Sequence, residues 1–461
     1  MIKVYMDWNV MAQLKNDSHQ ELKEILSNKN QFLILYSTAH IGDILSSSDG
    51  SEKRQKYIDS DLEYISRMTD DRCIFIEGEK VVVDYYSPKE LFEQRISGIH
   101  LLSDLATKGL FSIFEGMDIP QEVIHSFNDR MKSMSVESIF TDTVNAPEKT
   151  EHIEKFFPGL KENPTFEGLI TGFIRMIQGL NENESYKDLR QTVQSGLKIK
   201  RDKIFDSKAP FEIINKAYEK AGIERSDQLK NSKQGPAWYN QICNEYIQLD
   251  MHGYQEDNIN TKKGRKETFK NTTEDAFHCA FATGSNFYIT NDHKTYNKTR
   301  KIYEKLALQT AVMKPDEFVK HFKDYLDIEN DAANFYLINE VIKTSKFYEE
   351  DMNDSKLRIY PIPYFLFNFF NKVMVIVNNH EEIDSIILSR TNPTYNFLLP
   401  IEISTLITRL ITIFGIDQEG LGELNKVELD DKEWKERVWV QENARWTLRR
   451  LNGHFQLYFT F

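Results

Sequence analysis

The chain has 461 residues, more than one ordinary domain holds, so two or three domains are expected. Its 71 acidic and 58 basic residues give a net charge of −13, which excludes a wholly basic nucleic-acid coat protein but leaves room for a local basic patch. A hydrophobic fraction of 40% and a charged fraction of 28% exclude a disordered or collagen-like chain.

The cysteines and the apolar stretches indicate the cellular compartment and whether the protein crosses a membrane. Cys73, Cys243 and Cys279 are odd in number and far apart, so they form no disulfide framework and indicate a reducing compartment. Asp7 interrupts the amino terminus too early for a signal-peptide core. The most apolar stretch, residues 359–371, contains two prolines and is shorter than the roughly 20 residues of a membrane-spanning helix. The sequence therefore predicts a cytoplasmic protein with no membrane partner.

The first fifty residues alternate strands and helices. Residues 2–6 show a period of two that ends at Asp7, and residues 32–36 are continuously apolar, as in a strand covered on both faces of a parallel sheet. Between them apolar residues recur at helical spacing, and Ser37 or Thr38 caps a further helix. Residues 1–48 are the predicted first part of an α/β core.

The middle of the chain has a different pattern. Residues 49–261 are predicted to be a mainly α-helical insertion, with two short candidate strands at 73–76 and 80–84. Residues 262–327 return to the α/β pattern and form the predicted second part of the core. Its expected elements are a helix over 272–282, a strand over 286–290, a basic helix over 296–306, a strand over 310–313 and a helix opened by Pro315.

Residues 328–461 are predicted to form a separate α+β C-terminal domain. Its clearest signal is Asn452-Gly453, a dipeptide typical of the turn in a β-hairpin. A group of aromatic side chains is interpreted as core rather than as a platform for stacking bases: Tyr360, Tyr364, Phe365, Phe367, Phe369 and Phe370. We expect this domain to serve regulation or self-association. Its removal should change regulation or assembly and leave intact the acidic pocket formed by Asp7, Asp43, Asp275 and Asp292.

Each α/β block places two acids near the end of a strand. Asp7 and Asp292 directly follow predicted strands, and Asp43 and Asp275 lie on helices beside such strands. Ligands of open α/β sheets bind beyond the carboxyl ends of the strands, so the four acids converge if the two blocks form one sheet. Crowded carboxylates repel each other unless a cation neutralises them. Without a His or Cys set at zinc spacing, these oxygen ligands favour Mg²⁺ or Mn²⁺.

The motifs around these acids resemble those of PIN-domain ribonucleases. The resemblance covers residues 1–70 and 265–325 and is carried by Met6–Asn9, Ser37–Asp43, Glu274–Ala280, Thr290–Asp292 and Val312–Phe318. It implies a PIN-like parallel-sheet nuclease core, which this chain interrupts with the long helical insertion.

The resemblance also implies roles for single residues. Asp7, Asp43, Asp275 and Asp292 would be the catalytic, metal-binding acids, and Asn9, Thr290 and Asn291 their polar neighbours. Asp43 stands where the family usually has Glu. The implied reaction is metal-assisted hydrolysis of phosphodiester bonds by an endonuclease, in which bound water is the nucleophile. RNA is the substrate that the resemblance favours.

Charge supports a nucleic-acid partner. Residues 262–305 carry ten Lys and Arg against five Asp and Glu, although the whole chain is acidic, and such a patch suits a phosphate backbone. The residues expected to contact nucleic acid are Lys262, Lys263, Arg265, Lys266, Lys270, Lys294 and Lys298. This pattern does not distinguish RNA from DNA.

Several of these candidate residues also have an ordinary structural interpretation. Asp275 fits a first-turn acid favoured by the helix dipole, Asp43 a solvated helix residue, and Asp292 a turn residue. His40 and His278 each lie three residues from an acid and are interpreted as packed, hydrogen-bonded histidines rather than catalytic groups. The basic run before Asp275 is equally typical of a solvated loop.

Two other functions compete with a nuclease. A haloacid-dehalogenase-like phosphatase needs a second Asp two residues after the first, where this chain has Asn9. A non-catalytic sensor or scaffold would use the insertion and the C-terminal domain for recognition. The metal-dependent endonuclease is preferred, in the setting of a bacterial toxin or anti-phage defence effector that self-association or a regulatory partner holds silent.

Overall fold

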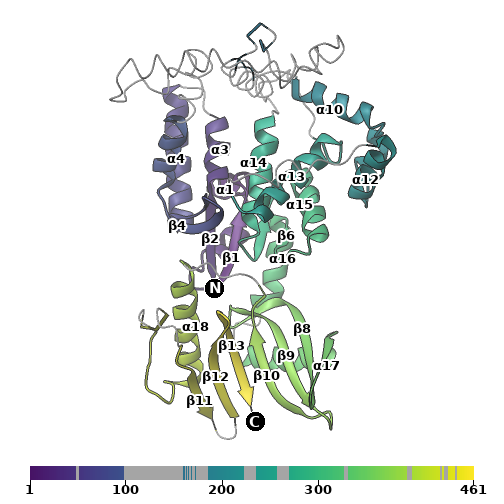
Figure 1. Ribbon diagram of the computed structural model, residues 1–461. Helices are drawn as coiled ribbons and strands as arrows, with labels where there is room; N and C mark the ends of the chain where they lie inside the picture. Colours follow the sequence, from purple (N-terminus) through teal and green to yellow (C-terminus); the bar gives the residue numbers. More distant parts are fainter. Residues whose placement is uncertain are drawn as a thin grey trace.

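The computed structural model describes residues 1–47, 51–97, 185–222, 235–256, 269–326, 331–391, 397–425, 428–429, 434–441 and 444–460, with isolated positions between 159 and 172. Two sheets organise these residues (Figure 1). No helix in this described part is both long and apolar enough to cross a membrane.

The first sheet is mixed, with the strand order β4-β3-β2-β1-β5-β6. Every neighbouring pair is parallel except β3 and β4. The strand order reverses at β1, and open α/β sheets bind ligands at such a point. The strands are β1 (Ile2–Met6), β2 (Phe32–Ser37), β3 (Arg72–Glu77), β4 (Lys80–Tyr85), β5 (Phe287–Ile289) and β6 (Ala311–Met313).

The pairing of β1 with β5 joins segments that are nearly 300 residues apart in the sequence. Tyr5 lies opposite Tyr288, and Met6 lies opposite Ile289. The prediction that the two α/β blocks share one sheet is therefore confirmed. Because the two strands are parallel, Asp7 and Thr290 leave the sheet at the same edge.

Helices cover both faces of this sheet, and all five residues of β1 are buried. Ile2, Val4 and Met6 pack in a core with α1 (Trp8–Lys15), α2 (Gln20–Leu26), α4 (Glu52–Thr69) and α16 (Pro315–Leu326). Tyr5 packs on the other face with α13 (Ala237–Met251), α14 (Phe269–Ala282) and α15 (His293–Lys305). Helix α3 (Thr38–Ser46) follows β2 and contributes to both cores.

The first sheet continues past the predicted domain boundary at residue 48. The candidate strands at 73–76 and 80–84 form β3 and β4, and β3 pairs with β2. The boundary was too early because short apolar runs within a helical pattern do not show which sheet they join. The insertion also contains α10 (Ser185–Gly196), α11 (Arg201–Ile204) and α12 (Pro210–Ala221).

The second sheet has seven antiparallel strands in the order β11-β12-β13-β10-β9-β8-β7. Asn452 and Gly453 have φ angles of 51° and 80°, as the predicted hairpin turn requires, and they join β12 to β13. The elements are α17 (Asp331–Thr344), β7 (Tyr348–Met352), β8 (Ser355–Leu366), β9 (Phe370–Asn378), β10 (Ile383–Ser389), α18 (Leu399–Phe414), β11 (Arg437–Gln441), β12 (Ala444–Leu451) and β13 (His454–Thr460).

The C-terminal domain is joined to the first sheet by buried contacts. The Lys3 ammonium on β1 lies 3.7 Å from Glu402 of α18, which also accepts a 2.7 Å hydrogen bond from Arg390. The ring of Phe365 packs against Phe287 of β5. These contacts tie the C-terminal domain to β1 and β5, and the survival of the acidic pocket after deletion of the domain stays a prediction.

The aromatic side chains singled out in the C-terminal domain belong to its hydrophobic core, as the sequence predicts. Tyr360, Phe365, Phe367, Phe369 and Phe370 are each at most 5% exposed. Rings buried to this degree offer no face on which nucleic-acid bases could stack.

Candidate active site

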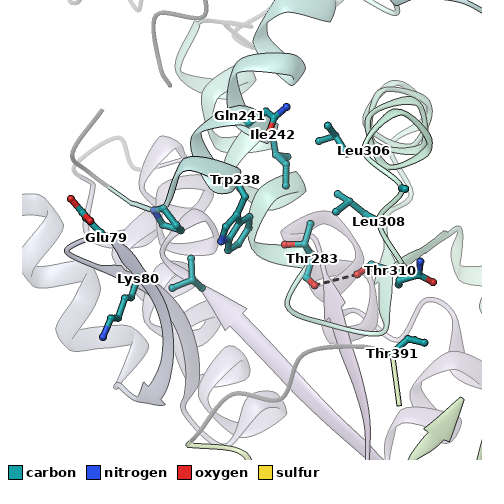
Figure 2. A pocket seen from close by; sticks show the side chains of 14 residues that line it. Glu79, Lys80, Trp238, Gln241, Ile242, Thr283, Leu306, Leu308, Thr310 and Thr391 are labelled. Atoms are coloured by element: carbon teal, nitrogen blue, oxygen red, sulfur yellow. Dashed lines mark hydrogen bonds between the residues drawn. The ribbon is translucent and has the colours of Figure 1, made fainter. Parts of the chain in front are cut away.

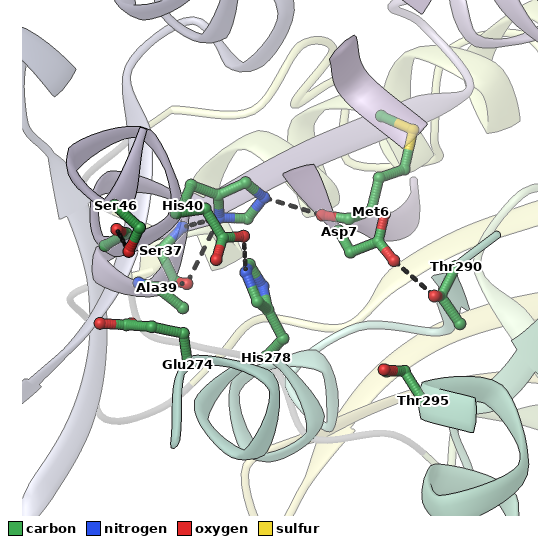
Figure 3. A network of polar contacts seen from close by, with 12 residues as sticks. Met6, Asp7, Ser37, Ala39, His40, Ser46, Glu274, His278, Thr290 and Thr295 are labelled. Carbon is green, nitrogen blue, oxygen red and sulfur yellow. Dashed lines mark hydrogen bonds and ion pairs between the residues drawn. The ribbon is translucent and has the colours of Figure 1, made fainter. Parts of the chain in front are cut away.

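Asp7 is a buried acid at the carboxyl end of the central strand. It caps α1, and its Oδ1 accepts a 2.9 Å hydrogen bond from the Val10 backbone N–H. Its Oδ2 accepts a hydrogen bond from the Thr290 hydroxyl (Figure 3). Asp7 is 5% exposed, and burial raises its pKa to about 7. Burial is the largest cause of this shift; the nearby charges of Asp43 and Asp292 also raise the pKa, and the two hydrogen bonds lower it.

Asp292 lies at the same edge of the sheet and caps α15. Its Oδ1 accepts hydrogen bonds of 2.9 and 2.7 Å from the backbone N–H groups of Lys294 and Thr295. Its own backbone N–H donates to the Thr290 hydroxyl at 3.2 Å. Thr290 therefore links the two acids, and Asp292 is a helix cap rather than the turn residue that the alternative interpretation proposed.

Of the three predicted polar neighbours, Thr290 contacts an acid. Asn291 instead donates a 3.1 Å hydrogen bond to Gln13, and Asn9 is exposed. The expected contact of Asn9 with Asp7 is not seen: Asn9 is the second residue of α1 and is exposed, whereas Asp7 is buried.

Asp43 and His278 are joined across α3 and α14. The Nε2 of His278 lies 2.9 Å from Asp43 Oδ2, and its Nδ1 lies 2.7 Å from the Tyr5 hydroxyl. That hydroxyl is also 2.6 Å from the Ser37 hydroxyl. Burial first, and then the charge of Arg95, lower the pKa of His278 to about 3, so the ring is neutral at pH 7.

His40 is a second buried histidine at this site, and its ring centre lies 4.7 Å from that of His278. Its Nδ1 accepts a 3.0 Å hydrogen bond from the Ser37 backbone N–H, so its Nε2 carries the proton and donates to the Met6 carbonyl at 2.7 Å. Both histidines are packed and hydrogen-bonded, as the sequence interpretation proposed, and His40 holds the backbone next to Asp7.

Asp275 lies in the second turn of α14 and is half-buried, so the first-turn interpretation is wrong. The pKa of Tyr288 is raised by burial first and then by the charges of Asp7, Tyr5 and Asp275. Asp7 and Asp275 therefore both lie close enough to Tyr288 for their charges to act on it.

Glu274 is a buried acid that the sequence analysis did not single out. It is 2% exposed and accepts a hydrogen bond from Arg95, which also donates to the Thr38 carbonyl at 2.6 Å. Arg95 belongs to a helical segment at 88–97. The only signal in the sequence was the position of Glu274 beside Asp275, because its partner lies 179 residues earlier.

Gly42 is the residue of α3 that makes room for Glu274. A Cβ at this position would lie 2.2–2.3 Å from the Glu274 carboxylate. We expect Gly42→Ala to displace Glu274 from Arg95 and to lower the free energy of unfolding by about 1–3 kcal/mol. Gly196→Ala is the matched control, since nothing lies within 4 Å of a Cβ there. Equal unfolding midpoints for the two variants in urea would contradict this.

The predicted nucleic-acid contacts are partly corrected. Lys262, Lys263, Arg265 and Lys266 lie outside the described residues, as does the side chain of Lys270. Lys294 is partly exposed beside Asp292. Lys298 is fully buried and lies 2.7 Å from Asp250, so it cannot reach a nucleic acid.

The four acids fit a hard divalent cation in chemistry and charge. All offer carboxylate oxygens, and the charges of Asp43 and Asp292 both act on buried Asp7. Asp7 Oδ1 accepts a hydrogen bond from Val10 and Oδ2 accepts one from Thr290, and each oxygen has a second lone pair that suits a cation. In the described part of the chain, however, no three acidic, imidazole or thiol side chains form a ready metal site. The chain matches no family profile, curated protein or solved structure.

A pocket of about 670 Å³ lies away from the acids, at the edge where β5 and β6 begin (Figure 2). Trp238, Ile242, Leu306 and Leu308 supply apolar walls, and Glu79 and Lys80 of the β3–β4 turn line another side. The pocket contains none of the predicted site residues.

Proposed function

We propose that this protein is a Mg²⁺- or Mn²⁺-dependent endonuclease of the PIN-like kind that hydrolyses RNA. The observation that carries the proposal is the parallel pairing of β1 with β5. It brings Asp7 and Asp292 to one edge of the sheet, where Thr290 bonds to both. Asp43 on α3 acts electrostatically on Asp7, and Asp275 on α14 acts on Tyr288, the β5 residue that pairs with Tyr5.

Asp7, Asp43, Asp275 and Asp292 would hold the ion. When bound, it would supply a water of lowered pKa and positive charge next to the scissile phosphate. The chain itself contributes rigid acids: Thr290 and Val10 fix the Asp7 carboxylate, and the first N–H groups of α15 fix that of Asp292. The unfavourable charge on buried Asp7 is what a cation would neutralise.

Lys294 supports an anionic polymer as substrate, since it is partly exposed two residues from Asp292. RNA is proposed as the substrate because of the resemblance to PIN-domain ribonucleases. DNA is included in the cleavage assay as the alternative substrate. A bacterial toxin or anti-phage effector is the setting in which such an enzyme would be held silent by a partner or by self-association.

The test is cleavage of labelled RNA and DNA in Mn²⁺, with EDTA as the metal-free arm. Asp292→Asn keeps a side chain that caps α15 but removes the charge, so we expect about a 100-fold loss, corresponding to roughly 3 kcal/mol of metal-dependent stabilisation. Asp316→Asn is the matched control, because its side chain is 95% exposed on α16. Equal cleavage by wild type and Asp292→Asn would refute the proposal.

The competing function is a non-catalytic nucleic-acid-binding sensor or scaffold. It is favoured by one observation, the lack of three converging metal ligands among the described residues. RNA binding without cleavage, and with no effect of Mn²⁺ or of Asp292→Asn, would support this function instead.

A further inference from the structure

We propose that His278 is a positioning residue that orients the Asp43 carboxylate toward the metal site, with Tyr5 and Ser37 holding its ring; this rests on the proposed function. The chain of contacts crosses three elements. Ser37 ends β2, and Tyr5 lies on β1. His278 reaches across from α14 toward α3 (Figure 3).

An unbroken series of hydrogen bonds runs from Ser37 to Asp43. The Ser37 and Tyr5 hydroxyls are 2.6 Å apart, the Tyr5 hydroxyl and His278 Nδ1 are 2.7 Å apart, and His278 Nε2 and Asp43 Oδ2 are 2.9 Å apart. Ser37 and Tyr5 are fully buried, and His278 is 1% exposed. The Asp43 side chain is 28% exposed, so the buried chain ends at an acid that reaches solvent.

The direction of each hydrogen bond follows from chemistry. The Asp43 carboxylate can only accept, so His278 Nε2 carries the proton. The Nδ1 of a neutral ring then accepts from the Tyr5 hydroxyl, whose oxygen accepts from the Ser37 hydroxyl. The Ser37 oxygen is fixed in turn by the Ala39 backbone N–H at 3.2 Å. One tautomer and one ring orientation of His278 satisfy every contact, which is how partner groups orient ligands around metal sites.

His40 is a histidine with a structural role in the same core, and its hydrogen bonds differ from those of His278. Its Nε2 donates to the carbonyl of Met6, a group already fixed by the sheet. His278 donates instead to a side chain on another element, 235 residues away. The Asp43 side chain is one methylene group shorter than that of the glutamate expected there from the resemblance. A fixed orientation of the carboxylate compensates for this shorter reach.

The experiment measures Mn²⁺ affinity of the full-length protein by electron paramagnetic resonance of free Mn²⁺, beside RNA cleavage. We expect His278→Leu to weaken Mn²⁺ binding by about 10- to 100-fold, the usual cost of losing a ligand-orienting partner. His278→Gln places an amide N–H near the Nε2 position, so affinity should return to within roughly threefold of wild type.

Tyr5→Phe is the second variant, and it keeps the aromatic ring in the core. We expect a measurable loss of Mn²⁺ affinity, because His278 Nδ1 loses its donor. Tyr303→Phe is its matched control: it removes another buried hydroxyl, which donates at 2.5 Å to the backbone carbonyl of Cys279 and not to the His278 ring. This pair keeps the test decisive if His278→Leu does not fold.

The outcomes separate the two proposals. Wild-type Mn²⁺ affinity in both His278→Leu and Tyr5→Phe, with loss in Asp292→Asn, would overturn the positioning role and leave the nuclease intact. A loss in Tyr303→Phe equal to that in Tyr5→Phe would also overturn it. A wild type that neither binds Mn²⁺ nor cleaves RNA would refute the proposed function, and the positioning role with it.

Discussion

Replacing Asp7 by asparagine is expected to stabilise the metal-free protein at pH 7.5 and to remove the stabilisation that Mn²⁺ gives the wild type. Burial raises the pKa of Asp7 from 3.8 to about 7, so near neutral pH the folded protein holds a charge that the unfolded chain carries more easily. This gap corresponds to a cost on the order of 4 kcal/mol once Asp7 is ionised.

The sign of the pH dependence follows from proton binding. Between about pH 4 and pH 7 the folded state binds the Asp7 proton more tightly than the unfolded state, so this group's contribution to stability falls as pH rises. Asparagine does not titrate. The variant should therefore unfold several degrees above the wild type at pH 7.5 and close to it at pH 4 in thermal scans with EDTA.

Mn²⁺ should reverse this order. An ion that binds the folded state stabilises it by mass action, and Asp7→Asn removes the most buried of its ligands. We expect Mn²⁺ to raise the unfolding temperature of the wild type, to leave the variant unchanged, and to support RNA cleavage by the wild type alone. The same Mn²⁺ shift in both proteins would show that the ion binds elsewhere.

Replacing Asp250 by asparagine is expected to cost about 3–5 kcal/mol of stability, because it leaves two cations buried without an acid. Asp250 is fully buried on α13 and accepts hydrogen bonds of 2.7 Å from Lys298, 3.1 Å from Arg190 and 2.7 Å from Tyr186. Lys298 belongs to α15, the helix that Asp292 caps, and Arg190 belongs to α10. The acid therefore ties the insertion to the second half of the core.

Two variants make this prediction specific. Lys298→Met leaves Asp250 paired with Arg190, so it should cost less than Asp250→Asn. Glu212→Gln breaks an exposed ion pair with Lys216 on α12 and should cost less than about 1 kcal/mol. Urea unfolding gives all three values. A loss in Asp250→Asn no larger than that in Glu212→Gln would contradict the prediction.

Local patterns in the sequence were sufficient for much of the fold. The apolar run at 32–36, the candidate strands at 73–76 and 80–84, and the Asn452-Gly453 hairpin all correspond to observed elements. Each depends on interactions between near neighbours in the chain: periodic burial, or the positive φ that a tight turn requires. The acids that follow strands could be found in the same way.

The burial of charged and polar side chains could not be predicted in this way. The alternation in residues 2–6 suggested that Lys3 and Tyr5 lie on a more polar face, yet both are fully buried because helices cover each side of the sheet. Lys298 looked like part of a basic, exposed helix face. Its acid lies 48 residues earlier on α13, and no local pattern marks which face α13 covers.

Short-range periodicity and turn chemistry locate the elements and the acids at their ends. Long-range packing sets which acids lie at one edge, through the pairing of β1 with β5, and which polar groups hold them: Thr290 for Asp7, His278 for Asp43 and Arg95 for Glu274. Those partners are 179 to 283 residues apart along the chain, and only the packed sheet and its helices bring their atoms within hydrogen-bond distance.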